Sequence, residues 1–436
     1  MSARVAIIGA GPAGLMAGIA AAEAGADAIV TEQLDRPAAK LLATGGGRCN
    51  FTNMLRPEEF MARFGRQGRF MQPALAGLDP RGLRDFLTGL GLASYVAEGG
   101  GVYPVGDRAG DVRDALLGRC RELGVEIRCG VCAEGLLFDE SLPPGLRGVR
   151  TSTKERSAQR PSLVENQEIS ASAVVIACGG QSYPDLGGTG GGYDLAAQAG
   201  HTILQPVAAL VALRVREEWL CQCAGVSLQS RVWIDLPGRS RRGQTGDVLI
   251  THRGLSGPAV LDLSSEVSEL LGRGGRESVP LRLEVCAGVG KAQWKERLEG
   301  WRRHEGRRRL EILLAQHLPA RLAELFCRQA GCLGTLASQA PADKAQALAE
   351  MLSALSLEVS GTEGFASAMV TRGGVSLRQV DPRTLQSRLL RGLFFAGEVL
   401  DLDGPCGGYN LQWAFSSGRL AGLSAAHTRD SRPVAL

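Results

Sequence analysis

The feature that most constrains the fold is a short apolar run followed at once by closely spaced glycines. Residues 5–8 (Val-Ala-Ile-Ile) have strand length, and Gly9-Ala10-Gly11-Pro12-Ala13-Gly14 comes next, before a stretch of small residues that ends near Gly25. In such a unit Gly9 permits the sharp turn, Gly11 lets the backbone approach a pyrophosphate, and Gly14 lets the helix pack on the strand. The sequence therefore predicts a dinucleotide site at residues 9–14.

An acidic residue stands at the spacing that such a site requires. Residues 28–31 predict a second strand, which ends at Glu32, 23 positions after Gly9. A carboxylate there can bind the adenosine ribose hydroxyls, and it would repel a 2′-phosphate. FAD and NAD share the adenosine diphosphate half, so this segment alone does not distinguish them.

Two later segments repeat the pattern of a strand followed by glycines. Residues 171–178 predict an apolar strand that leads into Gly179-Gly180, and residues 393–396 predict another that leads into Gly397-Glu398. A helix is expected from Tyr409 to Gly418. Because the chain returns to its first sheet so late, the middle must be inserted, and a long two-ended ligand such as FAD fits this organisation best.

The inserted part divides by pattern. Short β-like runs between residues 203 and 288 predict a small β domain. From 291 to 357 glycine becomes scarce and apolar residues recur at helical spacing, which predicts helices. The expected organisation is therefore an α/β fold with a discontinuous Rossmann-like domain (1–200 and 360–436), a small β domain (201–289) and a helical subdomain (290–359). Residues 151–170 are expected to form a surface loop or a strand excursion, and 125–132 a strand.

Charge and cysteine content exclude several function classes. With 49 basic and 45 acidic residues, the net charge of +4 does not by itself indicate a nucleic-acid or membrane-surface binder. Eleven cysteines in 436 residues form no disulfide framework, and the pairs Cys129/Cys132 and Cys221/Cys223 lack the second cluster that a structural zinc site needs. We therefore expect a cytoplasmic protein without a metal. The arginine run at 302–309 is interpreted as a solvated helix face, which makes nucleic acid an unlikely partner.

Five motifs in order resemble those of the BaiN-like NAD(P)/FAD-dependent oxidoreductases, also known as the aminoacetone-oxidase family of flavoproteins. They are the first glycine turn, residues 40–53 (KLLATGGGRCNFTN), residues 179–184 (GGQSYP), residues 251–258 (THRGLSGP), and residues 397–401 (GEVLD) with 407–412 (GGYNLQ). The resemblance extends from about Val5 to Gly422. It implies an FAD domain of the two-dinucleotide-binding type with an inserted barrel-like domain and helices.

The resemblance also implies which residues hold FAD. Residues 9–14 and Glu32 would bind the adenosine diphosphate, residues 40–53 would line the flavin, Gly397-Glu398 would lie at the ribitol, and residues 410–412 would lie at the ring. The expected cofactor-binding residues are Gly9, Ala10, Gly11, Pro12, Ala13, Gly14, Glu32, Lys40, Arg48, Asn50, Ala177, Gly179, Gly180, Gly397, Glu398, Asn410, Leu411 and Gln412.

Few side chains are needed for catalysis, because a flavin carries most of the chemistry. The candidate proton donors are Tyr103 and Tyr183, which each precede a proline, and His252, which precedes a glycine turn. For each of them, packing or a turn hydrogen bond is the alternative. Cys49 and Cys406 lie inside motifs, where packing is the simpler role.

Three functions remain open from the sequence. The first is NAD(P)H-driven reduction of an activated carbon–carbon double bond in a small molecule, although residues 187–192 (GGTGGG) lack the spacing of a second nucleotide motif. The second is oxidation of a small amine or aminoketone by oxygen. The third is a flavin-bound redox sensor or an RNA-associated protein without turnover.

Overall fold

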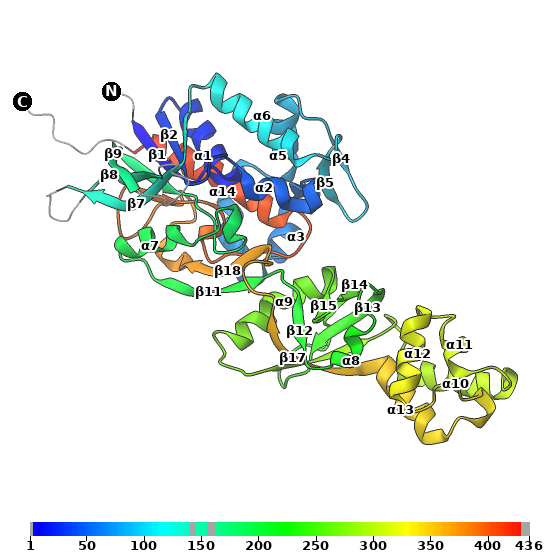
Figure 1. The fold of residues 1–436 in the computed structure, drawn as a ribbon. Coiled ribbons are helices and arrows are strands. Elements are labelled where there is room, and N and C mark those ends of the chain that lie inside the picture. The colour runs from blue at the N-terminus through cyan, green and yellow to red at the C-terminus, as the bar shows by residue number, and fades with distance from the viewer. Residues whose placement is uncertain (1–2, 140–144, 155–162, 429–436) are drawn as a thin grey trace, which may run out of the picture. The chain divides into compact units, whose positions relative to one another are not determined.

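The computed structural model describes residues 3–139, 145–154 and 163–428, which fall into two compact units (Figure 1). Unit 1 comprises residues 1–206 and 370–436, and unit 2 comprises residues 207–369. Unit 1 therefore contains both ends of the chain. Unit 2 begins within β11 (Ile203–Ala209) and ends just before β18 (Val370–Val375).

A five-stranded parallel sheet forms the centre of unit 1, with the strand order β19-β10-β1-β2-β6. Its strands are β1 (Arg4–Ile8), β2 (Asp27–Glu32), β6 (Glu126–Cys129), β10 (Ala173–Ile176) and β19 (Leu393–Phe395). The strands β1, β10 and β19 are almost wholly apolar and buried, as expected where helices cover both faces of a sheet.

The register of this sheet brings its loops together. Ile8 is level with Thr31 and with Ile176, and Ile176 is level with Phe395. The segments that follow these strands therefore leave the sheet at one edge, where ligands bind in open parallel sheets. The glycine turn, Glu32, residues 177–180 and residues 397–398 all belong to these segments.

Helices α1 (Pro12–Glu23) and α14 (Tyr409–Ala426) pack closely because small residues face each other. A Cβ atom at Gly418 or at Gly422 would lie 2.2 Å from the carbonyl oxygen of Ala13 or of Ala17, respectively. Helix α14 is thereby fixed against α1. The other α-helices of unit 1 are α2 (Ala39–Ala43), α3 (Pro57–Ala62), α4 (Gln72–Gly77), α5 (Pro80–Gly89), α6 (Ala109–Glu122) and α7 (Gly191–Gln198).

Unit 1 also contains two small three-stranded sheets. One has the order β3-β5-β4, with β3 (Thr52–Asn53), β4 (Ser94–Val96) and β5 (Gly101–Pro104). The other contains β7 (Val131–Phe138), β8 (Leu146–Lys154) and β9 (Leu163–Ser170). The single strand expected over 125–132 is thus divided between two sheets, because Gly130 has a left-handed φ of +72°. The segment expected as a loop or strand excursion forms parts of β8 and β9, and its residues 155–162 lie outside the described ranges.

Unit 2 contains a closed barrel with the order β12-β15-β14-β13-β16-β17. Its strands are β12 (Leu213–Val215), β13 (Ser227–Ile234), β14 (Gln244–Ile250), β15 (Gly254–Ser256), β16 (Val279–Glu284) and β17 (Leu355–Thr362). The helices of this unit are α8 (Glu218–Cys221), α9 (Pro258–Leu271), α10 (Lys291–His304), α11 (Leu310–Leu314), α12 (Ala320–Gln329) and α13 (Ala342–Ala354). One continuous apolar core joins the barrel to these helices. The predicted fold class, α/β with a Rossmann-like sheet, a barrel and a helical part, is confirmed.

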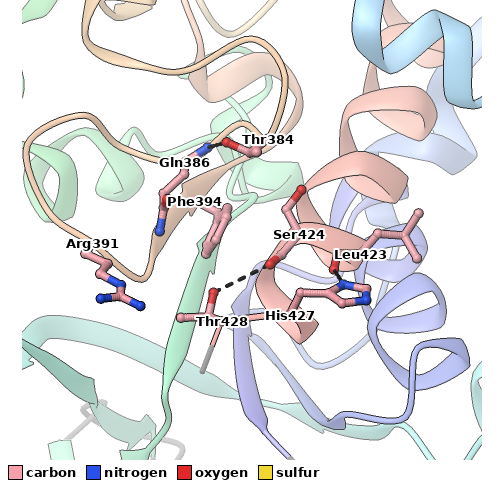
Figure 2. Close-up of a pocket in the computed structure, with 8 residues that line it drawn as sticks. All are labelled: Thr384, Gln386, Arg391, Phe394, Leu423, Ser424, His427 and Thr428. Atoms are coloured by element: carbon pink, nitrogen blue, oxygen red, sulfur yellow. Dashed lines mark hydrogen bonds between the residues drawn. The ribbon is translucent and has the colours of Figure 1, made fainter. Parts of the chain in front are cut away.

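A pocket lies beside the C-terminal end of α14 (Figure 2). Its lining consists of Thr384, Gln386, Arg391, Phe394, Leu423, Ser424, His427 and Thr428. Since an α-helix rises about 1.5 Å per residue, the length of α14 places this pocket about 27 Å from the glycines that precede the helix. The pocket is therefore distinct from the sheet edge that carries the glycine turn.

Candidate functional site

The glycine turn joins β1 to α1 with backbone geometry that side chains would prevent. Gly9 has a φ of +100°, and a Cβ atom at Gly14 would lie 1.8 Å from the Gly9 carbonyl oxygen. Gly11 is the N-cap of α1 and Pro12 its first residue, and no side chain caps the helix. The first N–H groups of α1 thus remain available to an anionic ligand.

Glu32 ends β2 beside this turn. Its carboxylate accepts hydrogen bonds from the backbone N–H groups of Ala10 and Leu34, at 2.9 and 3.0 Å. Burial raises the pKa of the Glu32 carboxyl above its ordinary value, and these hydrogen bonds act in the opposite direction. The structure therefore places Glu32 next to residues 9–14, as the sequence spacing predicts.

The second glycine-rich segment also reaches this edge. Gln33, the residue after Glu32, donates a hydrogen bond from Nε2 to the carbonyl oxygen of Gly187 at 2.8 Å. Sequence spacing excluded a second nucleotide motif here, and it gave no indication that the segment packs against the end of β2. This hydrogen bond and a second one, from Gln33 Nε2 to Thr189 Oγ1 at 3.4 Å, reveal the placement.

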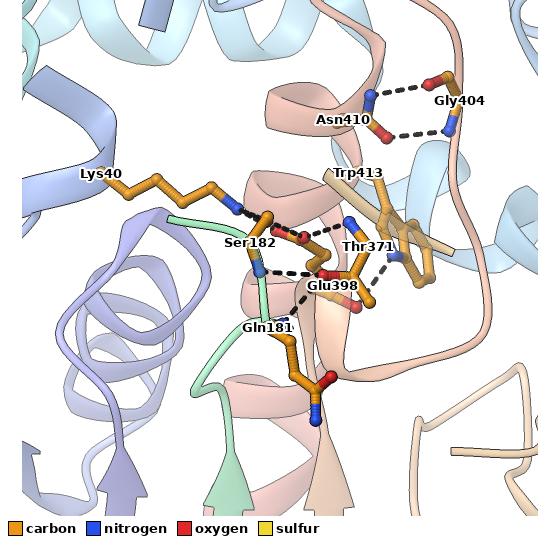
Figure 3. Close-up of polar contacts among 9 residues, drawn as sticks. Lys40, Gln181, Ser182, Thr371, Glu398, Gly404, Asn410 and Trp413 are labelled. Atoms are coloured by element: carbon orange, nitrogen blue, oxygen red, sulfur yellow. Dashed lines mark hydrogen bonds and ion pairs between the residues drawn. The ribbon is translucent and has the colours of Figure 1, made fainter. Parts of the chain in front are cut away.

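A polar network gathers four segments that are distant in sequence (Figure 3). Lys40 Nζ lies 2.7 Å from Glu398 Oε2 and donates a hydrogen bond to Ser182 Oγ at 2.6 Å. The other oxygen of Glu398, Oε1, accepts from Ser182 Oγ at 2.9 Å and from the N–H of Thr371 at 2.7 Å. Thr371 Oγ1 in turn accepts from the N–H groups of Gln181 and Ser182, at 2.8 and 3.1 Å. Glu398 is therefore fixed by three different donors.

Thr371 and Ser182 are the members of this network that sequence reasoning missed as functional residues. Both side chains are fully buried, although both are polar. Thr371 lies in β18, whose sequence includes two glycines and does not have a strong strand pattern. Ser182 lies inside a motif, and that was the signal available in the sequence.

The residues expected after β10 line the same network. Ala177 is buried and continues the sheet, since its N–H donates to the Ile8 carbonyl oxygen at 2.9 Å. Gly179 has a φ of +73° and borders open space. A Cβ atom at Gly180 would lie 2.5 Å from Thr371 Oγ1 and 3.0 Å from Glu398 Oε1, so only a glycine lets the chain pass so close to them.

The glycine-rich loop 44–50 lies against β5. Asn50 Oδ1 accepts a hydrogen bond from the N–H of Val102 at 3.1 Å, which ties the loop to the strand. The exposed Arg48 places its guanidinium carbon 4.9 Å from the centre of the Tyr103 ring. Tyr103 also borders Gly45, where its Cε1 lies 3.7 Å from the position of a Cβ atom. The structure thus brings three expected site residues, Arg48, Asn50 and Tyr103, together.

Helix α14 begins beside Asn50. A Cβ atom at Gly408, the N-cap, would lie 2.7 Å from Asn50 Oδ1. Asn410 closes the preceding loop through both its amide atoms, each 2.8 Å from a backbone atom of Gly404. Leu411 is half-buried in the first turn.

The side chain of Gln412 is fully buried and turned into the protein. Its Nε2 donates to the Leu78 carbonyl oxygen at 2.9 Å and to Ser416 Oγ at 2.8 Å. Gly397, which follows β19, is also bound by this helix. Its N–H donates a hydrogen bond to Ser417 Oγ, and its carbonyl oxygen accepts one from Trp413 Nε1. Gln412 and Trp413 therefore support the helix and the loop before it.

The two remaining catalytic candidates have free polar groups. Tyr183 is half-buried in unit 1 and has a left-handed φ of +52°. His252 is exposed in unit 2, between β14 and β15. Within the described ranges neither side chain forms a hydrogen bond, so the turn-stabilising bond considered for His252 is not present.

These residues fit FAD on direct structural grounds. The backbone at Gly11 borders open space, because no atom lies within 4 Å of the position of a Cβ atom there. The starts of α1 and α14 have no side-chain cap, so each offers backbone N–H groups and a positive helix end to a ligand. Two such helix ends beside glycines suit a long ligand with a central pyrophosphate.

Other candidate sites receive little support. In the part of the chain that the structure describes, no group of three or more His, Cys, Asp or Glu side chains could hold a metal ion. No helix there is both long and apolar enough to cross a membrane. In the arginine run, Arg302 and Arg303 both pair with Glu299, and Arg308 pairs with Glu305.

Comparison with known proteins gives matches over nearly the whole chain. Residues 3–424 match the family model described as the HI0933-like protein Rossmann domain. The chain is 33% identical over 428 residues to the 3-dehydro-bile acid delta(4,6)-reductase of Clostridium scindens, covering 97% of this chain and 99% of that protein. It is 31% identical over 415 residues to the ribosomal RNA dihydrouridine synthase of Escherichia coli, covering 94% and 95%.

Among solved structures, the 3-ketosteroid-delta4-(5alpha)-dehydrogenase of Rhodococcus jostii has a TM-score of 0.52 at 16% identity, covering 97% of this chain and 96% of that one. At this identity the likeness shows a common fold.

Proposed function

Because the chain belongs to the HI0933-like Rossmann family of FAD-dependent oxidoreductases, we propose that it reduces a carbon–carbon double bond conjugated to a carbonyl group, with NAD(P)H as the electron donor. The family resemblance seen in the motifs and the assignment as an FAD-dependent oxidoreductase are confirmed. The observation that carries the proposal is the full-length relation to a delta(4,6)-reductase, whose name describes reduction of ring double bonds.

When bound, FAD supplies two-electron chemistry, which accepts a hydride from one partner and gives it to another. In our proposal the protein contributes binding and orientation. The start of α1 and Glu32 would hold the adenosine diphosphate half, while Glu398, fixed by Lys40 and Thr371, would hold the ribitol. The loop 44–50 and the start of α14 would hold the ring, with the positive end of α14 directed toward it.

Reduction of a double bond also requires a proton at the second carbon. Tyr103 is the preferred donor, because its ring lies against the glycine-rich loop and its hydroxyl forms no hydrogen bond among the residues that the structure describes. Tyr183 and His252 are the alternatives. If Tyr103 is the donor, Tyr103→Phe lowers kcat about 100-fold or more while flavin content stays normal.

An anaerobic visible spectrum of the purified protein tests the proposed reaction. We expect NADH or NADPH to bleach the bound flavin, and a conjugated enone added afterwards to restore the oxidised spectrum. A flavin that stays oxidised with both donors contradicts the proposed donor. Reoxidation by oxygen with peroxide formation, but not by enones, would favour the oxidase alternative.

A second candidate substrate is the uracil ring of an RNA, whose double bond is also conjugated to a carbonyl. The specific observation is a basic ridge on unit 1, formed by Arg63, Arg66 and Arg69, which are all exposed. The short 3₁₀ helix Gly65–Met71 places side chains three residues apart on one side. Arg66 and Arg69 form no ion pair within the described ranges, so they remain available to phosphates.

A further inference from the structure

An aromatic strip extends from the glycine-rich loop toward solvent. Tyr103 on β5 and Tyr95 on β4 are directly paired across the two antiparallel strands. Their rings are stacked, with centroids 5.8 Å apart and planes inclined by 22°. Arg48 from the loop lies over Tyr103, and both tyrosines are only half-buried. Arg48, Tyr103 and Tyr95 are referred to below as the aromatic strip.

The strip lies on the outer face of its sheet. Residues alternate along β5, so Val102 and Pro104, which are buried, point to one face, whereas Gly101 and Tyr103 point to the other. The loop covers this second face at Gly101, where a Cβ atom would lie 2.7 Å from Asn50 Nδ2. Tyr95, which pairs with Tyr103, therefore lies on the same face of the sheet as Gly101 and Tyr103, past the part of that face that the loop covers.

Hydrogen bonds from Tyr95 and Arg48 also hold the strip in place. The Tyr95 hydroxyl donates a hydrogen bond to Asp107 Oδ1 at 2.7 Å, which fixes the ring. Arg48 Nε donates to the Gly45 carbonyl oxygen at 3.3 Å, and no carboxylate among the described residues pairs with its guanidinium. A fixed, partly exposed aromatic surface beside an uncompensated cation is suited to a flat ring that carries a carbonyl oxygen.

We propose that the aromatic strip binds the substrate, with Tyr95 stacking on a flat ring that carries a conjugated carbonyl group and Arg48 interacting with the oxygen. Tyr95 is thus a positioning residue, set back from the reacting atoms, and it contributes to specificity. The inference rests on the proposed function for the identity of the ring. It concerns binding, however, and can be tested without turnover.

Binding to the oxidised FAD-loaded protein tests the inference. The two probes are a steroid with a 4-ene-3-ketone and a single-stranded oligouridylate, each titrated against the wild type, Tyr95→Ser and Tyr95→Phe. Serine removes the ring, whereas phenylalanine keeps the ring and loses only the hydroxyl. Val96→Thr is the matched control, because Val96 is the next residue on β4, exposed on the opposite face.

We expect wild type to bind at least one probe, Tyr95→Ser to weaken that binding about 5- to 10-fold, and Tyr95→Phe and Val96→Thr to bind within about 2-fold of wild type. In turnover, Tyr95→Ser should raise KM more than it lowers kcat. The probe that responds identifies the source of the ring, a small steroid or an RNA.

The inference is overturned if wild type binds neither probe, if Tyr95→Ser binds as wild type does, or if Tyr95→Phe is as defective as Tyr95→Ser. Binding of a probe that is never reduced leaves the strip in place and refutes the proposed reaction instead. The two failures are therefore distinguishable.

Discussion

Lys40 Nζ lies 2.7 Å from Glu398 Oε2 and so joins residues 358 positions apart in the chain. Both side chains are mostly buried, with 25% and 20% of their surfaces exposed. The pair connects α2 near the first sheet strands with the loop after the last one. It thereby fixes the carboxylate that we assign to the ribitol of FAD.

Removal of Lys40 should cost more stability than removal of a surface cation. In Lys40→Met, Glu398 keeps its bonds from Ser182 and Thr371 but loses its counter-charge, so we expect the free energy of unfolding to fall by about 1–3 kcal/mol. Lys40→Met/Glu398→Gln should lose less than the sum of the single variants. Urea unfolding of the FAD-free protein measures all three, because bound FAD would add its own binding free energy to the stability of each variant.

The control for that cycle is Arg302→Met, which removes an exposed partner of Glu299 and should change stability by less than about 0.5 kcal/mol. Strict additivity of the Lys40 and Glu398 variants would show that the pair contributes nothing to folding.

Alanine substitutions at two glycines of the first turn should have different effects, one on stability and the other on FAD binding. In Gly14→Ala the new Cβ atom would meet the Gly9 carbonyl, so the fold itself is destabilised with or without FAD. In Gly11→Ala the Cβ atom enters open space, so we expect the FAD-free protein to unfold within about 1 kcal/mol of wild type and the FAD content to fall strongly. Flavin absorbance and thermal unfolding separate the two effects. Normal FAD retention in Gly11→Ala would place the cofactor elsewhere.

Features of the site were predictable from sequence where the signal is local. The turn at Gly9 to Gly14 and the acid at Glu32 lie within one βαβ unit, whose spacing is set by the lengths of a strand and a helix. The network around Glu398 was not predictable in the same way. Its members Lys40, Ser182 and Thr371 come from separate segments, and only the sheet register brings those segments to one edge.

Gln412 has a side-chain direction that its motif does not reveal. It lies in a motif that the resemblance places at the flavin ring, yet the helical period turns its side chain toward Leu78 and Ser416. Tyr95 shows the reverse case. It lies in no motif, and its cross-strand pairing with Tyr103 depends on a hairpin register that composition does not reveal.

Stability should decline in mild acid because of His201. This buried side chain lies 2.7 Å from Ser387 Oγ through Nε2 and packs its ring on Phe395. Burial lowers the pKa of His201 from 6.5 to about 4. The unfolded chain therefore binds the proton first, so the stabilisation present above pH 6.5 is lost as the pH falls toward 4.

His201→Phe keeps a ring against Phe395 and cannot titrate. We expect it to be less stable than wild type near pH 7, by about 1 kcal/mol, because Ser387 loses a partner. The wild type should lose about 2–3 kcal/mol relative to the variant between pH 7 and pH 4. Taking the difference between the two proteins removes contributions from other groups such as Glu32. Parallel stability curves would refute this assignment.

The basic ridge gives a test of the RNA alternative that does not depend on turnover. Binding of a polyanion releases counterions, so the logarithm of the binding constant falls with the logarithm of salt concentration by about 0.7 per phosphate contacted in single strands. If Arg66 and Arg69 each contact a phosphate of an oligouridylate, Arg66→Gln/Arg69→Gln should make this slope shallower by about 1.4.

Arg302→Gln/Arg303→Gln is the matched control, because both arginines already pair with Glu299. An equal change in slope for both double variants would indicate general attraction to a basic protein. An unchanged slope in the Arg66 and Arg69 variant would remove the observation that favours RNA and leave the small conjugated ketone as the substrate class.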